Sequence, residues 1–347
     1  NGFIDDVRGW DFADGDNDPM DEDIHGTHVA GTIGAVANNG IGIAGVAWDV
    51  QILPLKIFGG GPTTTLQAAI GALDYLARLR RDFGVNVVAS NNSWGGYFYS
   101  QALKDVIDAC GDVGILTIAA AGNDGNNNDG RMAAYPASYD SPSIIAVAAT
   151  DRFDELAGFS NYGARSVDVG APGVGILSTV PGGEYAVLEG TSMAAPHVAG
   201  AVALVAAANP GASAATIRQI ILATATPLPS LRGMVATSAR LDIGTAVTFN
   251  PGGIDGIDGM VVRGGIITVE GVWDDIDIVH VVTTEIRVEN LHTATGLRLE
   301  SASDASLVIK LNGPNAGFTA GGYGLDSTTR VGGSVQVIGQ PNFPVVI

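Results

Sequence analysis

The sequence contains almost no cysteine and few basic residues. Cys110 is the only cysteine among 347 residues, and it lacks the context of a nucleophile, so we expect a buried structural thiol and no internal disulfide. Lysine occurs only at Lys56, Lys104 and Lys310, and 17 basic against 36 acidic side chains give a formal net charge of −19. Such an acidic surface argues against binding nucleic acid through its phosphates. It fits a secreted protein that stays soluble and takes up calcium.

Long apolar runs are missing as well. The Ala-rich stretch after Ser192 is shorter than a membrane span and contains His197, so we expect no membrane-spanning segment. The first residues, Asn1 to Asp6, are typical of the middle of a loop and not of a signal peptide. We therefore expect a fragment or a processed chain, whose missing signal says nothing about export.

Apolar runs and helical patterns alternate through the first 248 residues. Short apolar strands separated by amphipathic helices predict an α/β domain, in which helices cover both faces of a mostly parallel sheet. The expected strands are 52–58, 85–89, 115–121 and 144–148, and the expected helices are 25–36, 65–80, 100–110 and 192–208. The expected core-facing positions are Val29, Ile33 and Val36 in the first helix and Leu66, Ile70, Leu73, Leu76 and Leu79 in the second.

The pattern changes after a Pro/Gly linker at Asn250–Gly253. Residues 249–347 are expected to form an all-β domain, because short β-rich runs recur there between turns with Gly, Asn and Asp. Their even spacing without hairpin turns favours a β-solenoid, with a β-sandwich as the alternative. The chain stops within an apolar run, so we expect this domain to be incomplete. The runs are 266–269, 276–282, 285–288, 297–299, 306–311 and 335–338.

Three short motifs carry the residues suited to chemistry. They are HGTHVAG at 25–31, AAAGND at 119–124 and GTSMAAPHVAG at 190–200. Ser192 stands where an extended segment enters a helix, among unpaired N–H groups at the positive end of the helix dipole. Such a position can hold an anion, including a transition-state oxyanion. Taken alone, Ser192 is better interpreted as a helix N-cap, with the Ala/Gly spacing that follows allowing close helix packing.

Together the three motifs resemble those of the subtilisin-like serine proteases, or subtilases, over residues 1–248. The resemblance implies a three-layer fold and a serine endopeptidase. It assigns Ser192 as nucleophile, His25 as general base and the Asn123 amide as oxyanion donor together with the Ser192 N–H. A serine hydroxyl needs such a base at neutral pH, and the developing oxyanion needs fixed donors.

The resemblance also implies where substrate lies. An extended protein or peptide would pair with the backbone of Ser93, Trp94 and Gly95, as an added strand. The first specificity pocket would be walled by these residues and by Ala120, Ala121 and Gly122, with Ala134 at its floor. Such small residues predict a roomy pocket for a bulky apolar side chain.

Two loops are similar to the calcium loops of thermitase-type subtilases. The first would offer the carboxylates of Asp11, Asp14, Asp16 and Asp18, which are hard oxygen ligands. Met20 departs from that pattern, because it stands where the family can offer a side-chain oxygen. The second would use the side chain of Asn39 and the carbonyls of Ile41 and Ile43. No catalytic cofactor is implied.

The family order Asp, His, Ser is incomplete here. The Asp of the family lies at least thirty residues before the His, and only 24 residues precede His25. Phe3 to Asp6 matches that strand end poorly, so we expect the Asp upstream of Asn1 and impaired activity in this chain. A pro-segment, a monomer and a bacterial-type extracellular or cell-surface location are also expected.

A second class of function stays open. The subtilase fold could be the scaffold of a pseudoprotease or adhesion module, with the β-rich domain binding. Retention of Ser192, His25 and Asn123 together favours the enzyme, since a scaffold needs none of them. His28 and His197 are expected to be packed, hydrogen-bonded histidines. His280 and His292 have no neighbouring cluster, which argues against metal ligation.

Overall fold

The computed structural model describes residues 2–59, 61 and 63–249, and beyond them the backbone of nine strands between Gly259 and Ile338. The chain divides into two units, Asn1–Phe249 and Asn250–Ile347.

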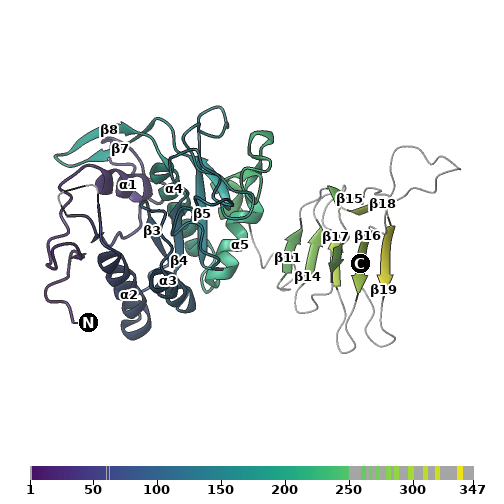
Figure 1. Ribbon diagram of the computed structural model, residues 1–347, viewed down its shortest axis with the longest axis horizontal. Helices are drawn as coiled ribbons and strands as arrows, with labels where there is room; N and C mark the ends of the chain where they lie inside the picture. Colours follow the sequence, from purple (N-terminus) through teal and green to yellow (C-terminus); the bar gives the residue numbers. More distant parts are fainter. Residues whose placement is uncertain are drawn as a thin grey trace, which may run out of the picture. The chain divides into compact units, whose positions relative to one another are not determined.

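A six-stranded sheet with the order β3-β4-β5-β6-β10-β9 forms the centre of the first unit (Figure 1). All neighbours in it are parallel except β9 and β10, so the expected parallel sheet is confirmed. Its strands are β3 (Ala89–Asn92), β4 (Leu116–Ala120), β5 (Ile144–Thr150), β6 (Val169–Pro172), β9 (Thr226–Pro227) and β10 (Ala239–Arg240).

Side chains alternate between the two faces of the sheet, as strand geometry requires. Leu116, Ile118 and Val147 pack in one core with α4 (Thr191–Ala208), α5 (Ala214–Thr224) and α6 (Ile243–Thr248). Ala119 and Ala146 belong to a second core with α2 (Leu66–Phe83) and α3 (Gln101–Asp112), which lie side by side (Figure 1). The first unit therefore has the three layers that the resemblance implies, with helices on both faces of a mostly parallel sheet.

The helices begin at identifiable caps. Thr65 accepts a hydrogen bond from Ala68 N at the start of α2, and Ser100 accepts one from Leu103 N at the start of α3. Leu73, Leu76 and Leu79 are buried as expected. Leu66 is 47% exposed, so its placement in the core was wrong, because it is the first residue of α2 and precedes the turn that packs.

Three other boundaries differ from expectation. Helix α1 (His25–Gly34) ends early, which leaves Val36 61% exposed where a core position was expected. The expected strand 52–58 shortens to β2 (Leu55–Lys56), which pairs in parallel with β1 (Trp10–Asp11). The expected strand 85–89 begins only at its last residue, because residues 84–88 lead from α2 to the sheet and Val85 is 43% exposed.

Helix α4 is longer than expected for the Ala-rich stretch after Ser192. Its 18 residues are long and apolar enough to cross a membrane by length and composition, and it is the one such helix in the described part of the chain. The core helix of a globular domain passes the same test, and 61% of α4 is buried.

Cys110 is fully buried, as expected, and burial raises the pKa of its thiol to about 12.

The described strands of the second unit form three three-stranded parallel sheets, with the orders β11-β14-β17, β12-β15-β18 and β13-β16-β19. Each of the first six of these nine strands pairs with the strand three places further along the chain. The expected runs overlap β12 (Ile266–Ile267), β14 (Val279–Val282), β15 (Glu285–Val288), β16 (Gly296–Glu300), β17 (Val308–Leu311) and β19 (Ser334–Ile338). The strands β11 (Gly259–Val262), β13 (Gly271–Trp273) and β18 (Gly317–Ala320) were not expected. His280 falls in β14, and His292 lies outside the described residues.

Candidate active site

Ser192 is the second residue of α4. The residue before the helix is Gly190, whose φ of 150° disfavours any residue with a Cβ. No side chain caps α4, so the interpretation of Ser192 as a simple N-cap is wrong. Its hydroxyl donates to Ser93 O at 3.1 Å, and the Ser93 hydroxyl donates to Ser192 O at 2.8 Å. This reciprocal pair holds the start of α4 against the segment that follows β3.

Asn123 follows β4 on a turn that needs Gly122, whose φ is 111°. The Asn123 Oδ1 accepts hydrogen bonds from Thr191 N at 2.8 Å and from Thr191 Oγ1 at 3.0 Å. These bonds assign Oδ1 to the helix side, and Nδ2 is left as the free end of the amide. Gly122 N in turn donates to Thr191 Oγ1 at 3.1 Å, so one threonine joins the loop to the helix.

Two donors converge beside Ser192. A Cβ built on Gly190 would lie 3.6 Å from Asn123 Nδ2 and 3.6 Å from Ser192 N. Neither donor has a hydrogen-bond partner among the described residues. Both also lie at the N-terminus of an 18-residue helix, where the dipole favours negative charge. The arrangement can hold an anion or an oxyanion.

His25 is the first residue of α1, whose start is held by Asp21. One carboxylate oxygen of Asp21 accepts from Thr27 N at 2.7 Å and from Thr27 Oγ1 at 2.6 Å. Farther along α1, the hairpin of β7 (Ile176–Val180) and β8 (Glu184–Leu188) clamps the helix. Ser178 donates to His28 O at 2.8 Å, and His28 Nε2 lies 3.0 Å from Ile176 O.

Helices α1 and α4 pack against each other. A Cβ on Gly200 would lie 3.3 Å from Ile33 O. Gly200 is eight residues after Ser192 (200 − 192), and Ile33 is eight residues after His25 (33 − 25). Ser192 and His25 therefore lie the same number of residues before this contact, each at the start of its helix. No hydrogen bond joins the two predicted catalytic side chains, since the serine hydroxyl donates to Ser93 O.

Burial lowers the pKa of His25 from its ordinary 6.5. The charges of Asp23 and Asp21 oppose this shift, and His28 adds to it. Within the described residues the His25 ring has no hydrogen bond to a carboxylate. The imidazole is therefore neutral at neutral pH, which is the form that a general base needs.

The remaining two histidines of the first unit are structural, as expected. His28 is fully buried and donates from Nε2 to carbonyls of β7 and β8. His197 Nδ1 lies 2.8 Å from Met193 O within α4, and burial lowers its pKa from 6.5.

Three segments expected to bind substrate lie together. Gly96 and Tyr135 exchange two backbone hydrogen bonds of 2.9 and 2.7 Å, which join the segment after β3 to the segment that contains Ala134. A Cβ on Gly122 would lie 3.5 Å from the Cβ of Ala134, which joins the loop after β4 to the same place. Ser93, Trp94 and Gly95 thus border the same region as Ala120, Ala121 and Gly122.

Sequence reasoning missed Asn161. This fully buried side chain accepts hydrogen bonds from Asp124 N at 3.0 Å and Asn126 N at 2.9 Å, and donates to Asn128 Oδ1 at 3.1 Å. Its own N–H donates to Gly122 O at 2.9 Å. Asn161 is therefore hydrogen-bonded to the chain on both sides of Asn123. No motif marks it, because it lies 38 residues farther along the chain (161 − 123).

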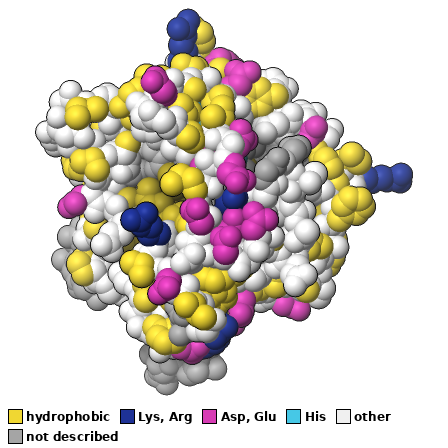
Figure 2. All heavy atoms as spheres, turned by 90° about the vertical axis from the view of Figure 1, so that its left-hand side faces the viewer, with side chains coloured by type: hydrophobic (Ala, Val, Ile, Leu, Met, Phe, Trp, Pro, Cys, Tyr) yellow, Lys and Arg dark blue, Asp and Glu magenta, His cyan; other side chains and the backbone are white. Residues whose placement is uncertain are grey.

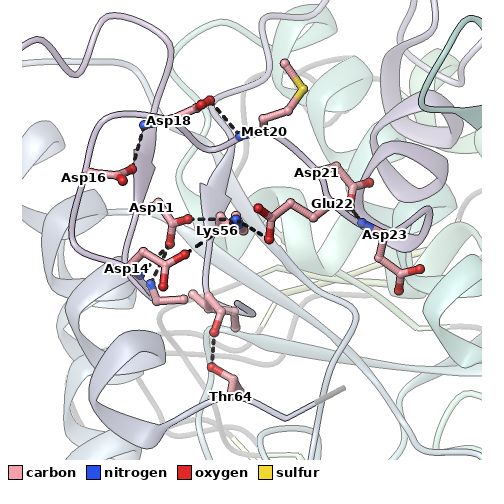
Figure 3. Close-up of polar contacts among 12 residues, drawn as sticks. Asp11, Asp14, Asp16, Asp18, Met20, Asp21, Glu22, Asp23, Lys56 and Thr64 are labelled. Carbon is pink, nitrogen blue, oxygen red and sulfur yellow. Dashed lines mark hydrogen bonds and ion pairs between the residues drawn. The ribbon is translucent and has the colours of Figure 1, made fainter. Parts of the chain in front are cut away.

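The first acidic loop does not fit calcium as it lies. Lys56 already contacts its carboxylates, and the Asp16 and Asp18 carboxylates accept hydrogen bonds from loop N–H groups (Figure 3). Across the described residues, no group of three or more His, Cys, Asp or Glu side chains is arranged to hold a metal ion. In the second loop, Asn39 Oδ1 accepts from Ile41 N at 2.9 Å, and Ile43 follows two residues later.

Comparison with known proteins agrees with this geometry. The sequence model described as the Subtilase family matches residues 1–257. The chain is 42% identical over 243 residues to the "Thermophilic serine proteinase" of Bacillus sp. (strain AK1), which covers 70% of this chain and 57% of that protein. It is 42% identical over 219 residues to thermitase of Thermoactinomyces vulgaris, covering 63% of this chain and 73% of thermitase.

A solved structure shows the same fold. The crystal structure of a cold adapted subtilisin-like serine proteinase superposes with a TM-score of 0.56 at 32% identity, covering 68% of this chain and 79% of that one. The chain spans little more than half the length of some curated relatives. On the match of its first 257 residues and on these likenesses, the chain belongs to the subtilase family of serine proteases.

Proposed function

We propose that this chain is a serine endopeptidase whose nucleophile is Ser192. His25 takes the hydroxyl proton as Ser192 Oγ attacks the scissile carbonyl, and then returns that proton to the leaving amine as the C–N bond breaks, which leaves an acyl-enzyme that water hydrolyses. Asn123 Nδ2 and the Ser192 N–H donate to the oxyanion. The proposal is supported by the proximity of these two unpartnered donors, each of which lies 3.6 Å from the Cβ position built on Gly190. In subtilisin, loss of the asparagine of the oxyanion hole lowers kcat by about 10²–10³.

We infer that acylation by residues 1–347 alone is slow. The lowered pKa of His25 keeps the imidazole neutral, but no carboxylate in the described part of the chain accepts a hydrogen bond from it. A carboxylate fixes the tautomer of the base and stabilises the imidazolium. Its removal from subtilisin lowers kcat by about 10⁴. We propose that a carboxylate hydrogen-bonded to His25, in the role of the family's Asp, restores this rate.

We propose that substrate lies extended along Ser93, Trp94 and Gly95. The side chain before the scissile bond enters between this segment and Ala120–Gly122, over Ala134. Ala134 is 5% exposed and Ala121 is fully buried, so short side chains leave the space to a bulky apolar group. Peptides matched except at that residue test this: a strong preference for Asp or Lys contradicts it. The variant Ala134→Leu should lower kcat/KM for a Phe peptide more than for an Ala peptide.

A fluorophosphonate probe tests the activity itself. The wild-type chain, Ser192→Ala and Asn123→Ala are incubated with the probe, and labelled protein is counted against time. We expect labelling of the wild type, none of Ser192→Ala and slower labelling of Asn123→Ala. Labelling that persists in Ser192→Ala would show reaction at another nucleophile.

One observation favours the second candidate, a pseudoprotease or adhesion module. The Ser192 hydroxyl donates to Ser93 O and not to His25. In that case the β-rich unit binds and the subtilase domain is a scaffold. Absence of probe labelling in a chain extended to include the family's Asp supports this alternative.

We also propose a β-solenoid for the second unit, because its strands pair every third place in three parallel sheets. We also propose that the second loop holds a hard cation through the Asn39 side chain and the carbonyls of Ile41 and Ile43. We further propose that the protein is made with a pro-segment, is a monomer and has an extracellular, bacterial-type location. Homologues such as thermitase and the subtilisins support protease activity in this family.

A further inference from the structure

The pairing of β1 with β2 brings one basic side chain into the acidic loop. Asp11 lies opposite Lys56 in this parallel pair, and Phe12 N donates to Lys56 O at 2.7 Å. Both side chains are therefore fixed by the backbone. Acidic side chains gather on the face that carries this part of the molecule (Figure 2).

The Lys56 ammonium lies at the centre of the loop (Figure 3). Its Nζ is 2.9 Å from Asp11 Oδ2, 3.3 Å from Glu22 Oε2 and 4.0 Å from Asp14 Oδ2. The side chains of Lys56 and Asp11 are 13% and 2% exposed. A contact this close and this buried is screened far less than a surface ion pair.

The other oxygen of Asp11 and the carboxylates of Asp16 and Asp18 accept hydrogen bonds from backbone N–H groups of the loop itself. Asp11 Oδ1 accepts from Ala13 N at 2.7 Å and from Asp14 N at 3.0 Å. Asp16 accepts from Asp18 N at 3.0 Å, and Asp18 accepts from Met20 N at 3.3 Å. Calcium needs about six to eight oxygen ligands at about 2.3–2.6 Å. A dication at Asp11 would therefore have to displace the ammonium.

We propose that Lys56 is the built-in cation of this loop and that it holds the loop in its fold in place of calcium. The ammonium supplies the positive charge that the buried Asp11 carboxylate requires, with the more exposed Asp14 and Glu22 (side chains 60% and 58% exposed) beside it. Because Lys56 belongs to β2, this charge is part of the chain. The loop leads directly to His25, so its fold becomes independent of the calcium concentration around the protein. The inference does not rest on the proposed protease activity.

Thermal unfolding of the whole 347-residue chain tests the proposal. The melting temperature is measured by circular dichroism in EDTA and in millimolar CaCl2. The variants are Lys56→Met, Asp14→Asn and Lys104→Met. The last is the matched control, because Lys104 forms a more exposed pair with Asp108 (side chains 22% and 37% exposed).

Two results are expected. Asp14→Asn leaves the calcium-induced shift of the melting temperature as it is in the wild type. Lys56→Met lowers the melting temperature in EDTA by about 5 °C, since it leaves a buried carboxylate unpaired, and Lys104→Met lowers it by far less.

Two results would overturn the proposal. In the first, calcium raises the melting temperature of the wild type and Asp14→Asn abolishes the rise, which means that calcium binds in this loop despite Lys56. In the second, Lys56→Met lowers the melting temperature in EDTA no more than Lys104→Met does. The first arm uses no Lys56 variant, so it stays decisive even if Lys56→Met fails to fold.

Discussion

Asn161 offers the most specific test of how the oxyanion loop is held. Asn161→Leu removes the acceptor for Asp124 N and Asn126 N and the donor to Asn128 Oδ1, at 3.0, 2.9 and 3.1 Å. Leucine has similar volume, so the packing around the fully buried position changes little. The two orphaned N–H groups flank the loop of Asn123 on its C-terminal side.

The size of the effect follows from these bonds. Each lost hydrogen bond costs about 1 kcal/mol, and water can replace part of the three bonds in this exposed loop. The native position of the loop is therefore destabilised by about 2 kcal/mol. At about 1.4 kcal/mol per tenfold, acylation should slow by about 10- to 30-fold. The ceiling is complete loss of the Asn123 donor, about 10²–10³. Because Asn161 touches no substrate, KM should change little.

The assay is the rate constant of the acylation burst with a p-nitrophenyl ester, at fixed pH, normalised to sites counted with a fluorophosphonate. Asn161→Asp keeps an oxygen acceptor for both N–H groups and should recover part of the rate. Asn209→Leu is the matched control, since the Asn209 side chain donates only to Val205 O of the preceding helix, at 2.9 Å. An acylation rate within twofold of wild type in Asn161→Leu, or a change confined to KM, would refute the reasoning.

Arg218→Met should lower the free energy of unfolding of the first unit by about 2–3 kcal/mol in urea, because it removes the 2.7 Å ion pair with Asp168. The Asp168 side chain is only 16% exposed, and burial already raises its pKa. Arg165→Met is the control, with an 82% exposed side chain 3.9 Å from its partner, and should cost almost nothing; equal losses in the two variants contradict the ranking. Stability should also fall as pH drops below 6.5, because burial lowers the folded-state pKa of His25 and His197, so that the unfolded chain binds more protons there. Urea midpoints between pH 7 and pH 5 measure this, and His197→Asn should flatten the slope; a midpoint that rises on acidification would reverse the sign.

The sequence predicted those parts of the fold that repeat a local pattern. Strand β4 alternates Leu116 and Ile118 toward one core with Ala119 toward the other, so its period and apolar character were both visible. Predicted ends were less accurate, as at Leu66 and Val36, because the packing of the first and last turns depends on distant segments. The strands β11, β13 and β18 were too short or too Gly-rich to stand out.

The candidate site divides in the same way. Ser192, His25 and Asn123 lie within contiguous motifs and were predicted from them. The contacts that hold these residues come from far along the chain, as with Asn161, and no local pattern indicates them. The partnership of Lys56 with Asp11 likewise joins residues 45 positions apart (56 − 11) through a two-residue strand pair, which short-range patterns do not reveal.

The central claim is that Ser192 is the acylated nucleophile. Intact-mass spectrometry of the chain after mixing with a slowly deacylating p-nitrophenyl ester measures it directly, with peptide mapping to locate the adduct. We predict one acyl group per molecule, on the peptide that contains Ser192, and none in Ser192→Ala. Two results would contradict the claim. One is the absence of an adduct when Ser192 is intact and the chain also includes the family's Asp, and the other is an adduct that persists in Ser192→Ala.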